Sequence, residues 1–264
     1  MGVGVQSMVR RVPMMLGPPA GGWLITKFGW EQGVRYALIG CIVLSAGTAI
    51  FQWFITDPEK QTEAASKIEP KITFAGVVKS FNPTLRELLI SDILIRFCER
   101  LPYAFVILWA MNHVGVSAEE FGWLVAIEMI TAMICYIPVA HLADKHGQRP
   151  FVLAKFIFFT LFPVSLLFAQ NLTWLAVAFV IRGLKEFGEP ARKALIIAQA
   201  SPEHRARTYG AYYLIRDCVV TMGSFLGAWL WSFGSTANFV GAAIFGCMGT
   251  VWFWILLIRK TKGR

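Results

Sequence analysis

Charged side chains inside long apolar runs are the residues of this sequence best suited to chemistry. Each run is long enough to cross a membrane, and a charge in hydrocarbon costs roughly 2.5–3.5 kcal/mol. Such side chains therefore usually face a partner or a polar cavity rather than lipid. The residues that this reasoning selects for substrate binding or ion coupling are Arg96, Glu99, Glu128, Arg182, Glu186 and Arg216.

Depth and spacing suggest how these residues work. Asp92 and Arg96 are spaced i,i+4 and Arg96 and Glu99 i,i+3, so the three share one helix face and can pair. A rise of about 1.5 Å per residue places Glu99 about 16 Å deep and Glu128 about 12 Å deep. At that depth burial favours a neutral carboxylate and a nearby arginine favours a charged one. We expect Glu99 or Glu128 to move protons, and Arg96 or Arg182 to attract an anionic group.

The apolar run 172–199 carries a second charged pattern. Arg182 and Glu186 are spaced i,i+4, as are Lys185 and Glu189, so each pair can form along one continuous helix. Other charges are read instead as structural ion pairs near the cytoplasmic surface, namely those of Asp92, Glu189, Arg192 and Lys193.

The composition indicates a membrane protein. Of the 264 residues 56% are hydrophobic and only 16% are charged, which is more apolar than a soluble domain. A helix of roughly 20 apolar residues spans the ~30 Å hydrocarbon layer. The sequence predicts an all-α integral membrane protein with about eight transmembrane helices, at residues 8–26, 35–56, 88–111, 120–141, 150–168, 172–199, 206–231 and 237–258.

The basic residues indicate which way these helices run. If the helices alternate, one side of the membrane collects eighteen lysines and arginines, whereas the other side has only Lys27 and Arg35. Basic residues remain on the cytoplasmic side, so both termini are predicted to be cytoplasmic in a multi-pass protein of the cell membrane. The net charge of +9 is explained by this topology, and no nucleic-acid partner is expected.

A repeat relates the first run to the seventh. The sequence RRVPMMLGPPAGGWL from Arg10 aligns with RDCVVTMGSFLGAWL from Arg216 at an offset of 206 residues. The polar segment 57–87 is read as a cytoplasmic linker. Residues 88–264 are then expected to form a complete six-helix bundle, and residues 1–56 the last two helices of another. The chain reads as a twelve-helix protein without its first four helices.

The charged loop 140–150, AHLADKHGQRP, joins two of the predicted helices. Gly147 permits a tight turn, and Pro150 begins the next helix, where its missing N–H costs nothing. The basic residues of the loop hold it in the cytoplasm. Its aspartate, at a helix end, can accept hydrogen bonds from the exposed N–H groups of a neighbouring helix.

Two six-helix units with such a loop resemble the major facilitator superfamily of secondary transporters. The loop is similar to that family's motif G-x-L-A-D-R-x-G-R-R, with Ala140 in place of its first glycine and Gln148 in place of an arginine. The resemblance implies that Asp144 helps to lock the two halves in one conformation, with Arg149 and Arg192 as partners. The gating loop that it implies consists of Asp144, Lys145, Gly147 and Arg149.

The resemblance further implies transport of a small solute across the membrane, by alternating access and with coupling to an ion or to protons. Substrates in this architecture bind between the two halves near the midplane. The expected partners are the lipid bilayer, a small-molecule substrate, protons and the missing N-terminal helices, without which the chain is not expected to form a closed pathway. The alternative is a non-transporting membrane remnant, or a helical bundle that binds a partner.

No enzymatic activity, cofactor or metal is expected. The motifs GxSxG, HExxH and GxxxxGK[ST] are absent from the sequence. His141, Asp144 and His146 have the spacing H-x-x-D-x-H, which a metal site can use. The loop motif already accounts for the aspartate, however, and no further ligand lies nearby in the sequence.

Overall fold

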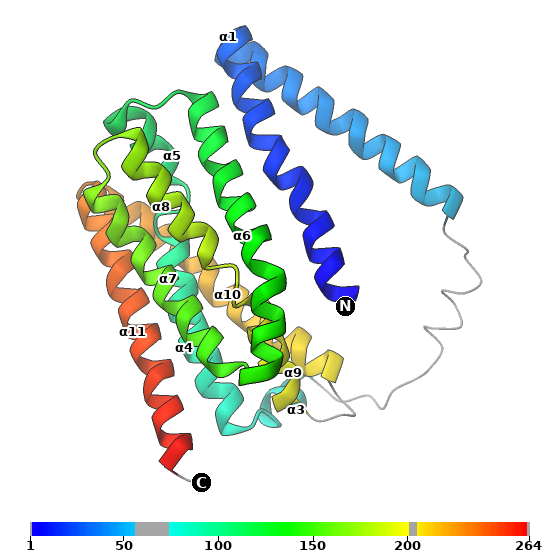
Figure 1. Cartoon of the computed structure of the whole chain (residues 1–264), viewed down its shortest axis with the longest axis vertical. Coiled ribbons are helices and arrows are strands. Elements are labelled where there is room, and N and C mark those ends of the chain that lie inside the picture. The colour runs from blue at the N-terminus through cyan, green and yellow to red at the C-terminus, as the bar shows by residue number, and fades with distance from the viewer. Residues whose placement is uncertain (1, 56–73, 201–204, 263–264) are drawn as a thin grey trace.

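The computed structural model of the chain describes residues 2–55, 74–200 and 205–262. These residues form helices joined by short turns, with no strand among them, so the predicted all-α class is confirmed for the described part. Figure 1 shows a bundle of upright helices with a helical hairpin at one side. Most of the predicted linker, residues 57–73, lies outside the described residues.

The hairpin is α1 (Gly2–Ile55), in which two helices meet at Gly29. Gly29 has φ 76° and ψ 169°, a left-handed conformation that glycine adopts without the strain of a side chain. We call residues 2–28 the first arm and residues 30–55 the second arm. They carry the first two predicted runs, and the second arm is exposed along most of its length.

The first arm packs against α6 (Ala118–His146). Two glycines allow a close crossing of the two backbones. A Cβ on Gly22 would lie 2.5 Å from the carbonyl oxygen of Ala118, and a Cβ on Gly122 would lie 2.5 Å from that of Pro18. Small residues at helix crossings are typical of membrane proteins, because they let two helices approach closely.

Two of the predicted helices are broken. The run 88–111 is divided between α4 (Pro83–Arg100), α5 (Phe105–Trp109) and the π-helical turn η1 (Ala110–Val114). The break follows α4 because Pro102 has no N–H with which to continue the helix.

The run 172–199 is divided between α8 (Leu172–Leu184) and α9 (Glu189–Gln199). Pro190 lies in the first turn of α9, where a proline suits the start of a helix. The same proline would interrupt a helix that continued from α8. The turn between α8 and α9 changes the pairing of the charged residues around it, as described below.

The remaining helices complete the bundle. They are α3 (Phe74–Lys79), α7 (Arg149–Phe168), α10 (Arg205–Trp231) and α11 (Ser235–Lys262). α11 packs against α4 and α7, α10 packs against α4, and α6 packs against α8. The short α3 lies against α10.

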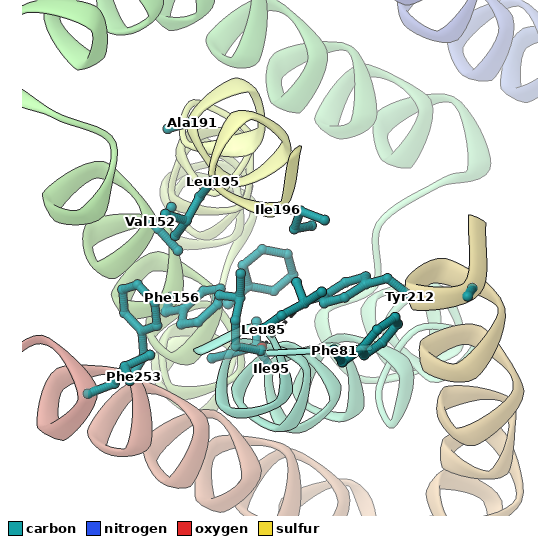
Figure 2. Close-up of a cluster of buried hydrophobic side chains, with 14 of the residues drawn as sticks. Phe81, Leu85, Ile95, Val152, Phe156, Ala191, Leu195, Ile196, Tyr212 and Phe253 are labelled. Carbon is teal, nitrogen blue, oxygen red and sulfur yellow. Dashed lines mark hydrogen bonds between the residues drawn. The ribbon is translucent and has the colours of Figure 1, made fainter. Parts of the chain in front are cut away.

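A cluster of buried apolar side chains holds several of these helices together (Figure 2). Phe156 of α7 and Phe253 of α11 contact each other with ring centroids 5.2 Å apart. Leu85 and Ile95 of α4 and Tyr212 of α10 belong to the same cluster. This core fixes α4 against the helices that carry most of the buried charges.

Three helical segments of the described part are long and apolar enough to cross a membrane, namely Arg11–Ile55, Arg149–Phe168 and Ser235–Arg259. The first of them contains parts of both arms of α1. Six of the eight predicted runs lie within single helices as far as the structure describes them, and the runs 88–111 and 172–199 are each interrupted by a turn. The arrangement of eight membrane spans stays a prediction.

Candidate functional site

A cavity of about 510 Å³ lies between the first arm of α1, α4, α6 and the turn from α8 to α9. Its wall contains five basic and four acidic side chains, those of Arg11, Arg96, Glu99, Glu128, Arg182, Lys185, Glu186, Glu189 and Lys193. Five of the six predicted site residues are among them, and the sixth, Arg216, is not. Helices far apart in the sequence thus bring most of the predicted charges to one place.

Glu99 of α4 is held by two bases. Nη1 of Arg96 donates to its Oε2 over 2.7 Å, and Nζ of Lys185 donates to its Oε1 over 2.6 Å. The predicted pairing of Arg96 with Glu99 is therefore present. Asp92, the third residue of that predicted face, instead contacts bases of α9 and α10.

Glu128 of α6 shares one of these bases. Its Oε1 lies 3.6 Å from Nζ of Lys185 and 3.2 Å from Nε of Arg182. Lys185 consequently links two carboxylates, that of Glu99 on α4 and that of Glu128 on α6.

The predicted i,i+4 pairs within residues 172–199 are wrong, because α8 and α9 are separate helices. Arg182 contacts Glu128 on α6 rather than Glu186. Glu186 accepts a hydrogen bond from Nη2 of Arg11 over 2.9 Å. This contact joins the turn between α8 and α9 to the first arm of α1.

Glu189 begins α9 and contacts bases from three helices. Arg192 reaches both of its carboxylate oxygens, at 2.7 and 3.1 Å. Lys155 of α7 forms an ion pair with Oε2, and Nη2 of Arg96 lies 3.6 Å from the same atom. The sequence predicts Glu189 only as part of a structural ion pair. In the structure it forms such pairs and also lies on the cavity wall.

A second charged group, which we call the inner cluster, consists of Asp92, Arg192, Tyr212, Tyr213 and Arg216. Oδ2 of Asp92 accepts from Nη1 of Arg192 over 2.5 Å and from Tyr212 over 3.2 Å, and lies 3.4 Å from Nη1 of Arg216. Arg192 also donates to Tyr213 over 2.7 Å. Arg216 lies here and not in the cavity, because α10 packs against α4.

The predicted gating loop spans the end of α6, which carries Asp144 and Lys145, a turn at Gly147 and Gln148, and the start of α7. Gly147 has φ 85°, as expected for the turn, and Arg149 and Pro150 open α7. Lys145 is exposed. The side chain of Asp144 lies outside the described residues, so its predicted contacts stay a prediction.

The alternative metal site falls in the same loop. His141 is exposed, whereas the side chains of Asp144 and His146 lie outside the described residues. Among the side chains that the structure describes, no group of three or more His, Cys, Asp or Glu is placed to hold a metal ion.

Sequence reasoning missed two bases that the structure adds to the charged regions. Arg11 lines the cavity, and Lys155, only 1% exposed, contacts Glu189. Both lie within the first two turns of an apolar run, where a basic residue indicates topology. A basic residue at such a position, inside the run rather than before it, is the signal that could have identified them.

A helical bundle around a charged cavity, in so apolar a chain, is the architecture of a multi-pass membrane transporter. Residues 88–264 match the family model of the Major Facilitator Superfamily. The chain belongs to this family of membrane transporters. The resemblance found in the sequence and the prediction that the chain is not an enzyme are confirmed.

Several curated proteins are similar to the chain. Multidrug resistance protein MdtH of Aeromonas hydrophila is 28% identical over 139 residues, which is 52% of this chain and 35% of the relative. Multidrug resistance protein MdtG of Dickeya zeae is 25% identical over 257 residues, 94% of this chain and 61% of the relative. The uncharacterized transporter YqjV of Bacillus subtilis is 26% identical over 175 residues, 66% and 43% of the two chains. The chain thus spans between 35% and 61% of the length of these relatives.

Proposed function

We propose that this protein moves a small solute across the cell membrane by alternating access, with the charged cavity as the path of the solute. The observation that carries this proposal is the convergence of charges from α1, α4, α6, α8 and α9 on one hollow. Charged groups inside a membrane protein usually mark the path of a substrate or an ion.

We propose further that residues 88–264 form one six-helix half and that residues 1–56 are two helices of the other half. Support comes from the family match, which begins at residue 88, and from the helices that lie on all eight predicted runs. In this arrangement residues 57–87 link the halves in the cytoplasm, and both termini are cytoplasmic.

Proton coupling is assigned to Glu99 and Glu128. Both lie on the cavity wall, and Lys185 contacts both. A proton that neutralised one carboxylate would leave Lys185 to the other, so proton binding would rearrange the ion pairs around the solute. The loop residues Asp144 and Arg149 are proposed to gate the cytoplasmic side, by analogy with the family.

The test is flux through lipid vesicles that contain the product of the whole gene. Ethidium serves as a cationic probe and 2-naphthoate as an anionic probe, each with and without a pH gradient. We expect flux of one probe to follow the pH gradient, and Glu99→Gln or Glu128→Gln to abolish that dependence. Glu31→Gln is the matched control, because Glu31 is exposed and contacts only Arg35. Unchanged coupling in both cavity variants would refute the assignment.

The 264-residue chain alone is the second sample in the same assay. We expect it to insert into the vesicles and to carry no flux, because it supplies one half of the proposed path and part of the other. Flux by this chain alone would contradict the proposed division into halves. Absence of flux from both samples would favour the alternative, a non-transporting membrane protein.

A further inference from the structure

The carboxylates of the cavity are all bound to bases, whereas one of its bases pairs with no carboxylate in the part of the chain that the structure describes. From this imbalance we propose that the solute is an organic anion, a carboxylate on an apolar body, and that Lys193 binds the carboxylate. This inference rests on the proposed function and adds to it the chemical class of the solute.

Each carboxylate on the cavity wall already contacts at least one base; they are Glu99, Glu128, Glu186 and Glu189. A cationic solute would therefore have to displace a base from its carboxylate and leave that base unpaired. Separating a buried ion pair in this way is unfavourable, because the charge left behind has lost both water and its partner. The cavity consequently disfavours cations.

Lys193 of α9 is the base that remains. It lines the cavity and is half-buried, yet it has no ion pair with any described residue. Glu189, one helical turn earlier, does not neutralise it, because that carboxylate is bound to Arg192 and Lys155. A partly buried ammonium group without a partner favours an anion that enters the cavity.

A second donor indicates the same class of ligand. Nε of Arg96 is buried and has no acceptor among the described residues, although the other nitrogens of this guanidinium contact Glu99 and Glu189. Buried donors are nearly always satisfied, so a donor without an acceptor in a side chain that lines a cavity points to a ligand or water. A carboxylate in the cavity would provide the acceptor once the guanidinium turned towards it.

The rest of the wall suits an apolar body. Met14, Val125 and Met129 line the cavity together with the rings of Tyr103 and Tyr136. Methionine side chains adapt to ligands of different shape, and aromatic rings offer flat apolar surfaces. The volume of about 510 Å³ falls within the range of small-molecule pockets, roughly 300–1,000 Å³.

The test measures binding to the purified 264-residue chain in lipid nanodiscs by calorimetry, with empty nanodiscs subtracted. The probes are 2-naphthoate, 2-naphthylmethylammonium and 2-naphthylmethanol, which share one ring system and differ in charge. We expect 2-naphthoate to bind at least about tenfold more tightly than the cation. Lys193→Gln should weaken 2-naphthoate about tenfold, the loss of one charged hydrogen bond, and leave the neutral probe unchanged. Lys79→Gln, at an exposed site on α3, should change neither.

Tighter binding of the cation, or an unchanged affinity for 2-naphthoate in Lys193→Gln, would overturn the anion class and leave the proposed function standing. Binding of no probe, in a protein whose vesicles still show flux, would overturn the cavity as the binding site. Absence of both binding and flux would refute the inference and the proposed function together.

Discussion

The cavity and the inner cluster are two charged regions built from some of the same helices, and they differ in how exposed their side chains are. The cavity and the inner cluster both use residues of α4 and α9, and they meet where Glu189 contacts Arg192. In the inner cluster the side chains of Asp92 and Arg192 are 1% and 0% exposed, whereas in the cavity those of Arg96 and Glu99 are 20% and 22% exposed and those of Glu128 and Lys185 are 5% exposed. The inner cluster is therefore enclosed by protein, whereas the cavity combines enclosed charges with charges that a ligand can reach.

This difference assigns the two regions different roles. In the enclosed region each charge is held by neighbours from other helices, so it fixes α4, α9 and α10 against one another. A buried pair of this kind is costly to break from one side. In the cavity Lys185 contacts both Glu99 and Glu128, so partners can be exchanged when a solute or a proton arrives. Variants that disturb one region and spare the other can therefore separate folding from transport.

The largest effect is expected from Arg192→Ala in the inner cluster. The substitution leaves Asp92 without its shortest contact and Glu189 without one of its bases, so the free energy of unfolding should fall by about 3–5 kcal/mol. Unfolding of the purified protein in detergent measures the change. Arg35→Ala, which removes an exposed pair with Glu31, should cost about 1 kcal/mol or less. Equal losses in the two variants would contradict a structural role for the inner cluster.

A smaller effect is expected from Gly183→Ala, which crowds the contact between α8 and α6 beside the cavity without changing a charge. The new Cβ would lie 2.6 Å from the carbonyl oxygen of Glu128 and 2.6 Å from Cβ of Thr131. Overpacking of this kind costs about 1–3 kcal/mol of stability. Gly210→Ala in α10 is the control, because nothing lies within 4 Å of its new Cβ. The unfolding temperature should therefore fall in Gly183→Ala and rise in Gly210→Ala. A shift of both temperatures in the same direction would count against the close packing of α6 against α8.

Lys185→Met tests whether the shared base couples the two carboxylates. The variant keeps the volume of the side chain and removes the link between Glu99 and Glu128. We expect the pH-driven part of vesicle flux to fall about tenfold, equivalent to ~1.4 kcal/mol. Lys79→Met, at an exposed position, should leave the flux unchanged. A normal pH response in Lys185→Met would show that the two carboxylates act independently.

A small loss of stability is expected from Arg11→Gln at the edge of the cavity. The variant removes the hydrogen bond that ties Glu186 to the first arm of α1, while the glycine-lined crossing with α6 remains. A hydrogen bond to a charged group contributes about 1.5–3 kcal/mol, and the partial exposure of this one places the expected loss near the lower limit. The shift in unfolding temperature against the unaltered chain measures it, and a loss as large as that of Arg192→Ala would contradict the distinction between the two regions.

The sequence predicted the helical class, the family and most of the cavity, because each depends on local signals. Apolar runs define helices, and charges inside them, such as Glu99 and Glu128, must find a polar place. The turn glycine Gly147 was also predictable, since its position demands a left-handed backbone.

The errors arose where tertiary packing decides. Arg182 and Glu186 have the spacing of a helical pair, but α8 ends at Leu184, so Arg182 lies on a helix and Glu186 in the turn that follows it. Arg216 also lies inside an apolar run, yet the packing of α10 against α4 places it against Asp92. Neither the break nor the rotation of a helix is encoded in the spacing of charges along one run.

The most direct test of the division between the two regions is the binding of 2-naphthoate per folded molecule in two matched variants. Lys193→Met alters the cavity, and Arg216→Met alters the inner cluster. We predict that Lys193→Met folds stably, because Lys193 has no ion pair with a described residue, and that it loses at least about tenfold in affinity, the effect of one charged contact. Arg216→Met should lose stability and bind 2-naphthoate normally for each molecule that remains folded. The reverse pattern, weak binding in a stable Arg216→Met and normal binding in Lys193→Met, would contradict this assignment.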